Sequence, residues 1–387
     1  MFKLKSLDYT LIAVVILLSV IGVFMIYATT NAPSIPGFVR RIYGDRWVRQ
    51  LIHILSGLFV LLFFSLIDLK WIGKYYLYIY GLMILLLIAT LVIGVDDATQ
   101  TARWIRIPMP FGIRLSMQPS EFSKIFIIIF LAKFLEVKKD VFNKPRYLLL
   151  LISLILLPVI LVQIQPSLSA SLVILFIALV IVFMAGIKRR TILIIFAFIF
   201  PLLVLLLLDI NRSEPRFITF FLADYQWERI YATLINPQLS TDAFLQTEGS
   251  LRAIRNGGLF GTGFLNNSYV ILGFNDFVFS AVAEQFGFIG GLFTLGLIGF
   301  IIVKCLKAAR HAESTFEKLI ASGVAGMLIF EAFVNTGVAL AILPNTGMPF
   351  PFVSYGGSMI WSHMMAVGFV INISQKGEKH EYCINST

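Results

Sequence analysis

Asp276 is the residue in this chain whose type and position best suit acid–base chemistry. It lies in GFNDFVFSAVAEQFGFIG (273–290), directly before an apolar segment long enough to form a helix. A carboxylate at the edge of a membrane segment is costly to keep without a function, and there it could accept a proton from the polar head of a lipid substrate. The alternative interpretation is that Asp276 only caps a helix beginning at Phe277, since aspartate favours that position.

A second pair of charged residues lies in QPSEFSK (118–124). Glu121 and Lys124 are three residues apart, so a helix places them on one face, where they can form an ion pair. Pro119 suits the first turn of that helix, and Ser120 or the polar residues before it could cap the helix. An ion pair at a membrane boundary is expected to face a cavity; the alternative is a pair at the helix start whose lysine reaches towards the interface.

Two further stretches could contact a charged ligand. TARWIR (101–106) contains Arg103 and Arg106, whose guanidinium groups suit phosphate and pyrophosphate; an interfacial anchor built around Trp104 is the alternative. The glycine-rich QTEGSLRAIRNGGLFGTG (246–263) would let the backbone turn tightly or approach a ligand. It lacks the Lys-Ser/Thr pair of a phosphate-binding P-loop.

The stretch NTGVALAILPNTGMPFPFVSYGGS (335–358) interrupts an apolar region with three prolines. Irregular backbone at membrane depth is tolerated where it is buried in protein or lines a cavity. Ser354 and Tyr355 would supply hydroxyl groups there, and a plain re-entrant turn is the alternative. His363 falls inside the last apolar segment, where a local hydrogen bond is the favoured interpretation; the four histidines show no metal-ligand spacing.

The composition predicts which elements position these residues. The 387-residue chain is 58% hydrophobic and 13% charged, with a mean hydropathy of +0.89, whereas soluble domains are about 25% charged. We therefore expect an all-α, polytopic integral membrane protein. The net charge of +10 does not indicate nucleic acid, because most lysines fall in short breaks between apolar runs, as in cytoplasmic loops.

Segments of about 20 apolar residues predict ten membrane spans, near 8–29, 48–67, 73–94, 119–136, 147–164, 168–187, 191–209, 278–303, 317–343 and 352–374. The lysine-rich breaks place both termini in the cytoplasm. We expect a single transmembrane domain over 1–387, with one long extracytoplasmic loop at 210–277. Arg40, Arg41, Arg46 and Arg49 are exceptions, since they fall on the outer side. Either they meet anionic lipid head groups or the orientation is weaker than the other loops indicate.

Five strings taken together resemble the SEDS family of cell-wall glycosyltransferases (shape, elongation, division and sporulation proteins). They are QPSEFSK, QPSLSASL, AIRNGGLFGTG, NDFVFSAVAEQFGFIGG and LPNTGMPFPFVSYGGS, in family order and spread over most of the chain. Within the family, LDYTLIAVVILLSVIGVFMIYA and RQLIHILSGLFVLLFFSLIDLK look more like the RodA branch than the FtsW branch.

The resemblance implies polymerisation of lipid II, an undecaprenyl-pyrophosphate-linked disaccharide pentapeptide, on the outer leaflet of the bacterial cytoplasmic (inner) membrane. It implies Asp276 as the essential acid and general base. It also implies a class B penicillin-binding protein (a transpeptidase) and the elongation machinery as partners, besides membrane lipids. No organic cofactor is implied, and a divalent cation (Mg²⁺ or Mn²⁺) is left open. The matching strings supply seven expected substrate-binding residues, Gln118, Ser120, Glu121, Lys124, Gln165, Ser354 and Tyr355. Arg103 of TARWIR is the eighth, because its guanidinium could stabilise the departing pyrophosphate.

The chain departs from the family pattern at three places. Phe274-Asn275 stands where the family usually has His-Thr, Gln285 where a second glutamate is common, and Ser167 where an aspartate follows Gln-Pro. The last change puts any role of a carboxylate at that position in doubt. Three other functions stay open: a lipid II flippase, a non-catalytic scaffold for the transpeptidase, and the division-type branch. A flippase would favour inverted repeats with paired broken helices, and the sequence shows no such repeat.

Overall fold

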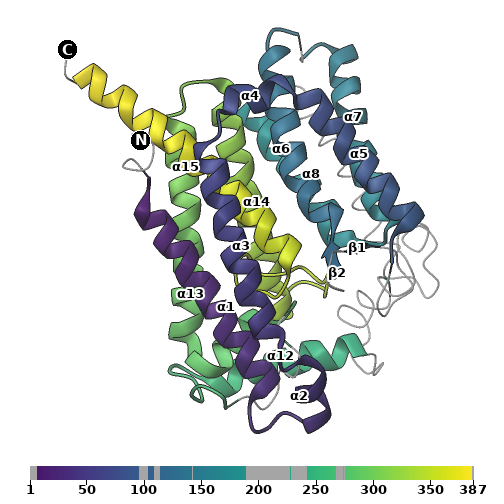
Figure 1. Cartoon of the computed structure of the whole chain (residues 1–387), viewed down its shortest axis with the longest axis vertical. Helices are drawn as coiled ribbons and strands as arrows, with labels where there is room; N and C mark the ends of the chain where they lie inside the picture. Colours follow the sequence, from purple (N-terminus) through teal and green to yellow (C-terminus); the bar gives the residue numbers. More distant parts are fainter. Residues whose placement is uncertain are drawn as a thin grey trace.

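The computed structural model describes residues 7–95, 103–108, 114–141, 143–188, 227, 242–266, 273 and 275–385. Helices form most of this part of the chain (Figure 1). Their bounds are α1 Tyr9–Asn31, α2 Gly37–Tyr43, α3 Arg46–Leu66, α4 Leu69–Lys74, α5 Tyr76–Ile93, α6 Pro119–Val137, α7 Pro145–Ile164, α8 Leu168–Met184, α12 Asp242–Gly257, α13 Val278–Arg310, α14 Thr315–Ala339 and α15 Gly357–Asn385. The strands β1 Ile105–Pro108 and β2 Arg114–Met117 pair antiparallel.

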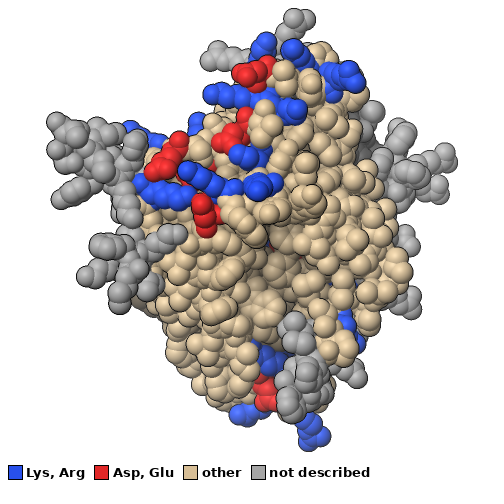
Figure 2. All heavy atoms as spheres, turned by 45° about the horizontal axis from the view of Figure 1, so that its top comes forward, with Lys and Arg blue, Asp and Glu red and all other residues tan. Residues whose placement is uncertain are grey.

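The helical membrane fold predicted from composition is confirmed. Six helices in the described residues are long and apolar enough to cross a membrane: α1, α2 joined to α3, α5, α7, α13 and α14. Figure 2 shows the complementary pattern on the surface: most of the visible charged side chains gather at one end of the molecule, a smaller group lies at the opposite end, and the body between them is largely uncharged. The predicted span at 191–209 and most of the predicted loop at 210–277 lie outside the described residues.

Several local predictions needed correction. The predicted third span, 73–94, begins later, because residues 69–74 form the separate short helix α4. The last span begins at Gly357, since residues 345–356 are irregular. The predicted loop at 95–118 contains the antiparallel strands β1 and β2, which we did not predict. Ser120 does not cap α6: it lies inside the helix, whose N-cap is Gln118 and whose first residue is Pro119.

Close helix crossings bring α15 against α3 and residues 352–354 against α1. A Cβ atom added at Gly368 would lie 2.7 Å from the Leu61 carbonyl oxygen, and one at Gly22 would lie 2.5 Å from that of Val353. Small residues at helix interfaces allow such approaches, because association within a membrane depends on packing. These contacts hold the irregular segment at 345–356 inside the bundle.

The glycine-rich segment after α12 joins a break in α13. At Gly287 the backbone leaves the helical region, with φ at +69° and ψ at −166°. The carbonyls of Glu284 and Gln285 instead accept hydrogen bonds from the amides of Thr262 (2.9 Å) and Gly263 (3.1 Å). In return, the Phe288 amide donates to the Gly258 carbonyl at 2.8 Å. Backbone groups freed by the break are therefore satisfied by protein, as the membrane requires.

Replacing Gly287 by alanine is expected to lower the free energy of unfolding by at least ~2 kcal/mol, because the residue has a positive φ and no room for a side chain. A Cβ atom there would lie 2.4 Å from backbone atoms of Leu259 and Gly261. Gly296→Ala is the matched control, since a Cβ atom at that position of α13 meets nothing within 4 Å. Thermal unfolding in detergent measures both, and equal melting temperatures would contradict this description of the break.

Candidate active site

A cavity of about 710 Å³ collects most of the polar residues singled out above. Its lining comes from the start of α3, the β-hairpin, the start of α6, the α7–α8 turn, the segment before α13 and the segment before α15. The lining includes Arg46, Arg49, His53, Arg103, Trp104, Ser116, Gln118, Glu121, Ser167, Ser169, Asn275, Asp276, Asn345, Thr346, Tyr355 and Trp361. The start of α3, which lines one side of the cavity, lies near α2 and α12. These elements are at the end of the bundle opposite α4 (Figure 1).

Asp276 lies at this cavity and does not cap a helix. Helix α13 begins at Val278, and its N-cap residue is Phe277, whose side chain makes no capping hydrogen bond. The Asp276 side chain is half-buried and contributes to the cavity lining. The capping alternative considered from the sequence is therefore wrong for this residue.

Two buried side chains fix the main chain on either side of Asp276. Asn335 of α14 donates from Nδ2 to the Asp276 carbonyl at 2.7 Å and to the Met348 carbonyl at 2.6 Å. Ser354 donates from Oγ to the Asn275 carbonyl at 2.5 Å and accepts from the Phe350 amide at 2.8 Å. Both side chains are fully buried. The proline-rich segment 345–356 therefore serves as the frame that places Asp276.

Gln50 of α3 holds the far side of that frame. Its amide nitrogen donates to the Ser354 carbonyl at 3.1 Å, and its amide oxygen accepts from the Gly356 amide at 3.2 Å. Gln50 is fully buried on α3, whose other buried residues are Ile54, Gly57, Leu61 and Ser65. A buried amide whose two ends are both bonded fixes one geometry, so α3 and the proline-rich segment form one wall.

Arginines on α3 form the cationic side of the cavity. The Arg46 guanidinium lies 4.5 Å from the Tyr43 ring centroid and 5.0 Å from that of Tyr355, distances typical of cation–π contacts. Arg49, three residues later, also lines the cavity. Of the four arginines predicted to lie on the outer side, Arg46 and Arg49 line the cavity. The sequence signal was their place on the predicted outer side together with their helical spacing, and we did not use it to name them as site residues.

Arg103 connects the cavity to the turn between α7 and α8. Its Nε donates to the Gln165 carbonyl at 3.2 Å and its Nη2 to the Pro166 carbonyl at 2.6 Å. The Gln165 side chain in turn donates to the Leu87 carbonyl at 3.0 Å. Arg103 therefore stabilises this turn as well as lining the cavity. Ser167, which stands in place of the family aspartate, also lines it.

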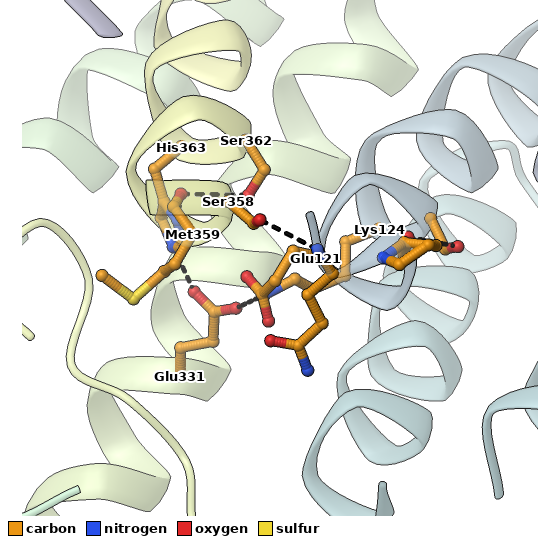
Figure 3. A network of polar contacts seen from close by, with 10 residues as sticks. Glu121, Lys124, Glu331, Ser358, Met359, Ser362 and His363 are labelled. Carbon is orange, nitrogen blue, oxygen red and sulfur yellow. Dashed lines mark hydrogen bonds and ion pairs between the residues drawn. The ribbon is translucent and has the colours of Figure 1, made fainter. Parts of the chain in front are cut away.

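A charged network lies behind the cavity wall (Figure 3). Lys124 forms ion pairs with Glu121 at 2.7 Å and with Glu331 of α14 at 2.6 Å. The pairing of Glu121 with Lys124 is thus as expected, while Glu331 was missed. Only Glu121 of these three lines the cavity. His363 makes the expected local contact with the Met359 carbonyl, and its other ring nitrogen lies 2.6 Å from Glu331.

The predicted site residues divide into two groups. Asp276, Arg103, Gln118, Glu121 and Tyr355 line the cavity. The other four, Ser120, Lys124, Gln165 and Ser354, are at most 1% exposed and lie behind its surface. Whether these residues bind substrate stays a prediction. Sequence reasoning missed Arg46, Arg49 and His53 at the cavity and Gln50, Asn335 and Glu331 behind it.

The described residues contain no cluster of three or more His, Cys, Asp or Glu side chains that could hold a metal ion. Mg²⁺ bound together with substrate phosphates needs fewer protein ligands, because one or two carboxylates and several waters then suffice. Asp276 and Glu121 are the carboxylates among the cavity-lining residues, and Glu121 is already paired with Lys124. Asp276 is thus the residue that fits such an ion.

This arrangement suits transfer of a group from an anionic leaving group. The half-buried Asp276 can accept a proton, and three arginines around the same cavity can stabilise negative charge. The buried side chains of Asn335 and Ser354 hold the main chain at Asp276 and Asn275. The main chain that carries the acid is therefore in place before substrate arrives.

Comparison with known proteins agrees with these features. The family model described as "Cell cycle protein", for FtsW, RodA and SpoVE, matches residues 8–379. The chain is 32% identical to a protein of Nitrosomonas europaea named "Probable peptidoglycan glycosyltransferase FtsW", over 95% of this chain and 92% of that one. It is 30% identical to a Saccharophagus degradans protein of the same name, over 97% and 95% of the two chains.

Two solved structures share the fold over almost their full length. One is reported under the heading "Structural coordination of polymerization and crosslinking by a peptidoglycan synthase complex", with a TM-score of 0.75, 27% identity, and coverage of 96% of this chain and 98% of that one. The other is the crystal structure of the rod shape determining protein RodA of Thermus thermophilus, with a TM-score of 0.66, 26% identity and 96% and 97% coverage. The chain therefore belongs to the FtsW/RodA/SpoVE family, the SEDS proteins.

Proposed function

We propose that this chain is a peptidoglycan glycosyltransferase that polymerises lipid II into glycan strands at the cavity containing Asp276. The observation that carries the proposal is the meeting of one half-buried acid with Arg46, Arg49 and Arg103 in a single cavity. Relatives of the chain are named as glycosyltransferases of this kind. The cavity volume of about 710 Å³ is enough for the sugar and diphosphate part of a lipid substrate.

The reaction joins the 4-hydroxyl of one sugar to the anomeric carbon of another. Asp276 takes the proton from the attacking hydroxyl as the new carbon–oxygen bond forms. The bond to the lipid diphosphate breaks, and the negative charge that develops there meets Arg46 and Arg49. The substrate's lipid tail stays in the membrane, so only its polar head needs the cavity.

Direct displacement with inversion at the anomeric carbon is the favoured course. A covalent intermediate would need a second carboxylate free to attack the sugar. Among the described residues that line the cavity, Glu121 is the other carboxylate, and Lys124 holds it in an ion pair at 2.7 Å. This leaves one carboxylate for one proton transfer. Asp276 would be the residue to hold a divalent cation, which would supply further positive charge to stabilise the leaving diphosphate.

The expected orientation places this chemistry outside the cytoplasmic membrane. The end of the molecule rich in lysine and arginine (Figure 2) would face the cytoplasm together with both termini, leaving α12 and the start of α3 on the outer side. A class B penicillin-binding protein is the proposed partner, because the glycan strands then need crosslinking. One of the similar structures belongs to a synthase complex described as coordinating polymerization and crosslinking.

An assay in proteoliposomes that contain purified lipid II distinguishes a polymerase from a flippase. We expect the chain, co-purified with its transpeptidase partner and with crosslinking blocked, to convert lipid II into long glycan strands. A transporter would instead move lipid II between the two leaflets and would not join it into glycan strands. Transport without polymer, under conditions that support other glycan polymerases, would replace the enzyme proposal by the transporter.

The role in elongation is a separate proposal, drawn from the RodA-like opening of the sequence. The division role has equal support, because the relatives described above are named FtsW. We expect the gene to restore rod shape in cells depleted of their elongation SEDS protein. In cells depleted of their division SEDS protein, we expect filaments to persist when the gene is expressed. Growth and cell shape measure both. Rescue of division alone would assign the chain to the division branch.

A further inference from the structure

Glu331 and His363 form a buried pair on the two helices behind the cavity (Figure 3). Glu331 of α14 and His363 of α15 are both 0% exposed, and His363 Nε2 lies 2.6 Å from Glu331 Oε2. The other oxygen of Glu331, Oε1, accepts from Lys124 Nζ at 2.6 Å. Glu331 therefore connects His363 to the Glu121–Lys124 pair and, through Glu121, to the cavity wall.

The contacts of the imidazole determine how many protons the pair holds. His363 Nδ1 lies 2.7 Å from the Met359 carbonyl oxygen, which can only accept, so Nδ1 carries a hydrogen. Nε2 then either carries a second hydrogen and donates to the Glu331 carboxylate, or accepts one from a protonated Glu331. In both cases the pair contains one proton more than a neutral histidine beside a carboxylate.

That proton balances the charge of the whole network. With it, the charges of Glu121 and Lys124 cancel, and so do those of Glu331 and His363. Without it, two carboxylates would face one ammonium group at membrane depth. The described titratable groups facing the pair are Lys124 and, through it, Glu121, both on α6; on its other side the imidazole meets the Phe352 ring at 5.3 Å. An unbalanced charge in such surroundings is costly.

We propose that Glu331 and His363 are positioning residues whose shared proton keeps this network neutral and so holds Glu121 at the cavity wall. Because His363 neutralises Glu331 from its far side, Lys124 can pair with both carboxylates without leaving the network a net negative charge. If that proton is lost, Glu331 competes with Glu121 for Lys124, and the cavity-lining carboxylate is free to move. The part concerning polymerisation rests on the proposed function, whereas the shared proton itself does not.

Removing the charge of His363 should have an effect that loss of its shape or of one hydrogen bond would not produce. His363→Gln keeps a hydrogen-bond donor near Glu331 but leaves the network with one uncompensated negative charge. We expect glycan polymerisation to fall roughly ten-fold or more, the change that ~1.4 kcal/mol of lost transition-state stabilisation produces. The loss should be relieved at lower pH, where Glu331 itself takes up a proton. His311→Gln, on an exposed histidine after α13, is the matched control.

Adding Glu331→Gln to His363→Gln removes the uncompensated charge. We therefore expect the double variant to be more active and more heat-stable than His363→Gln, although it has lost both native partners. It should also lose the dependence on low pH. Glu331→Gln alone should lose less activity than His363→Gln, because a glutamine amide can bond both Lys124 and a neutral His363. A double variant no better than His363→Gln would overturn the proposal.

A spectroscopic measurement tests the proton without any substrate. Nitrogen-15 NMR of histidine-labelled protein, with the His363 signal assigned by its loss in His363→Gln, should show either an imidazolium or a ring protonated at Nδ1. In the second case, an infrared carboxylic-acid band that disappears in Glu331→Gln must accompany it. A ring with one proton and no such band would overturn the shared proton. If no variant, wild type included, makes polymer, the proposed function fails while NMR and thermal stability still decide the charge balance.

Discussion

Asp276→Asn should abolish measurable glycan polymerisation. An asparagine has almost the same shape but cannot accept the proton of the attacking hydroxyl, and loss of a general base typically costs about 100- to 10,000-fold in rate. The buried side chains of Asn335 and Ser354 hold the main chain at this position, and both remain in the variant. The variant is therefore expected to fold and to bind the proposed transpeptidase partner. Rates of lipid II consumption at saturating substrate measure the effect.

Asp45→Asn is the matched control for that variant. Asp45 is an exposed carboxylate directly before α3, at the same end of the bundle, and it is not among the cavity-lining residues. We expect its rate to stay close to that of the wild type. A rate for Asp276→Asn within a few-fold of the wild type would show that another group removes the proton.

Arg49→Gln should have the second-largest effect, a loss of about 100-fold in kcat. Removing one group that stabilises charge developing in a transition state usually costs about this much. Arg49 lies in the same cavity as Asp276, one helical turn from Arg46, whose position is fixed between Tyr43 and Tyr355. Because the leaving diphosphate gains negative charge as its bond breaks, the change should appear in kcat more than in KM.

Arg41→Gln provides the comparison. Arg41 belongs to the short helix α2 before α3, is exposed, and is not among the residues that line the cavity. Its replacement should leave kcat nearly unchanged while removing the same charge from the same side of the membrane. Equal losses for Arg41→Gln and Arg49→Gln would indicate a general attraction to anionic lipid rather than a contact with the leaving group.

Much of the membrane fold could be predicted from hydropathy, because a helix that crosses lipid must be apolar over about 20 residues. The tight turn at residues 165–167 and the start of α6 at Pro119 also followed from local rules. The β-hairpin did not, since its four-residue strands are too short to show a periodic pattern. The break at Gly287 depends on hydrogen bonds from residues 258–263, which no local pattern reveals.

The candidate site also contains residues that could be predicted from the sequence and residues that could not. Asp276 could be found because an acid beside an apolar segment is unusual on its own. Glu331 and His363 could not be assigned, because each is a single polar residue in an apolar helix and its role depends on its partners. Lys124 precedes Glu331 by 207 residues, and only the packed bundle brings them to 2.6 Å. Arg46 and Arg49 stood out in the sequence because they fall on the predicted outer side, where basic residues are unusual. Their role could be inferred only once the structure placed them at the cavity.

The most direct test of the central claim compares wild type and Asp276→Asn in one experiment, each co-purified with its transpeptidase partner and supplied with labelled lipid II while crosslinking is blocked. The measured quantities are the length of the glycan product and the amount of lipid II bound. We predict long strands from the wild type, and bound lipid II without strands from the variant. Strands of equal length from both proteins would contradict the assignment of this cavity as the site of polymerisation.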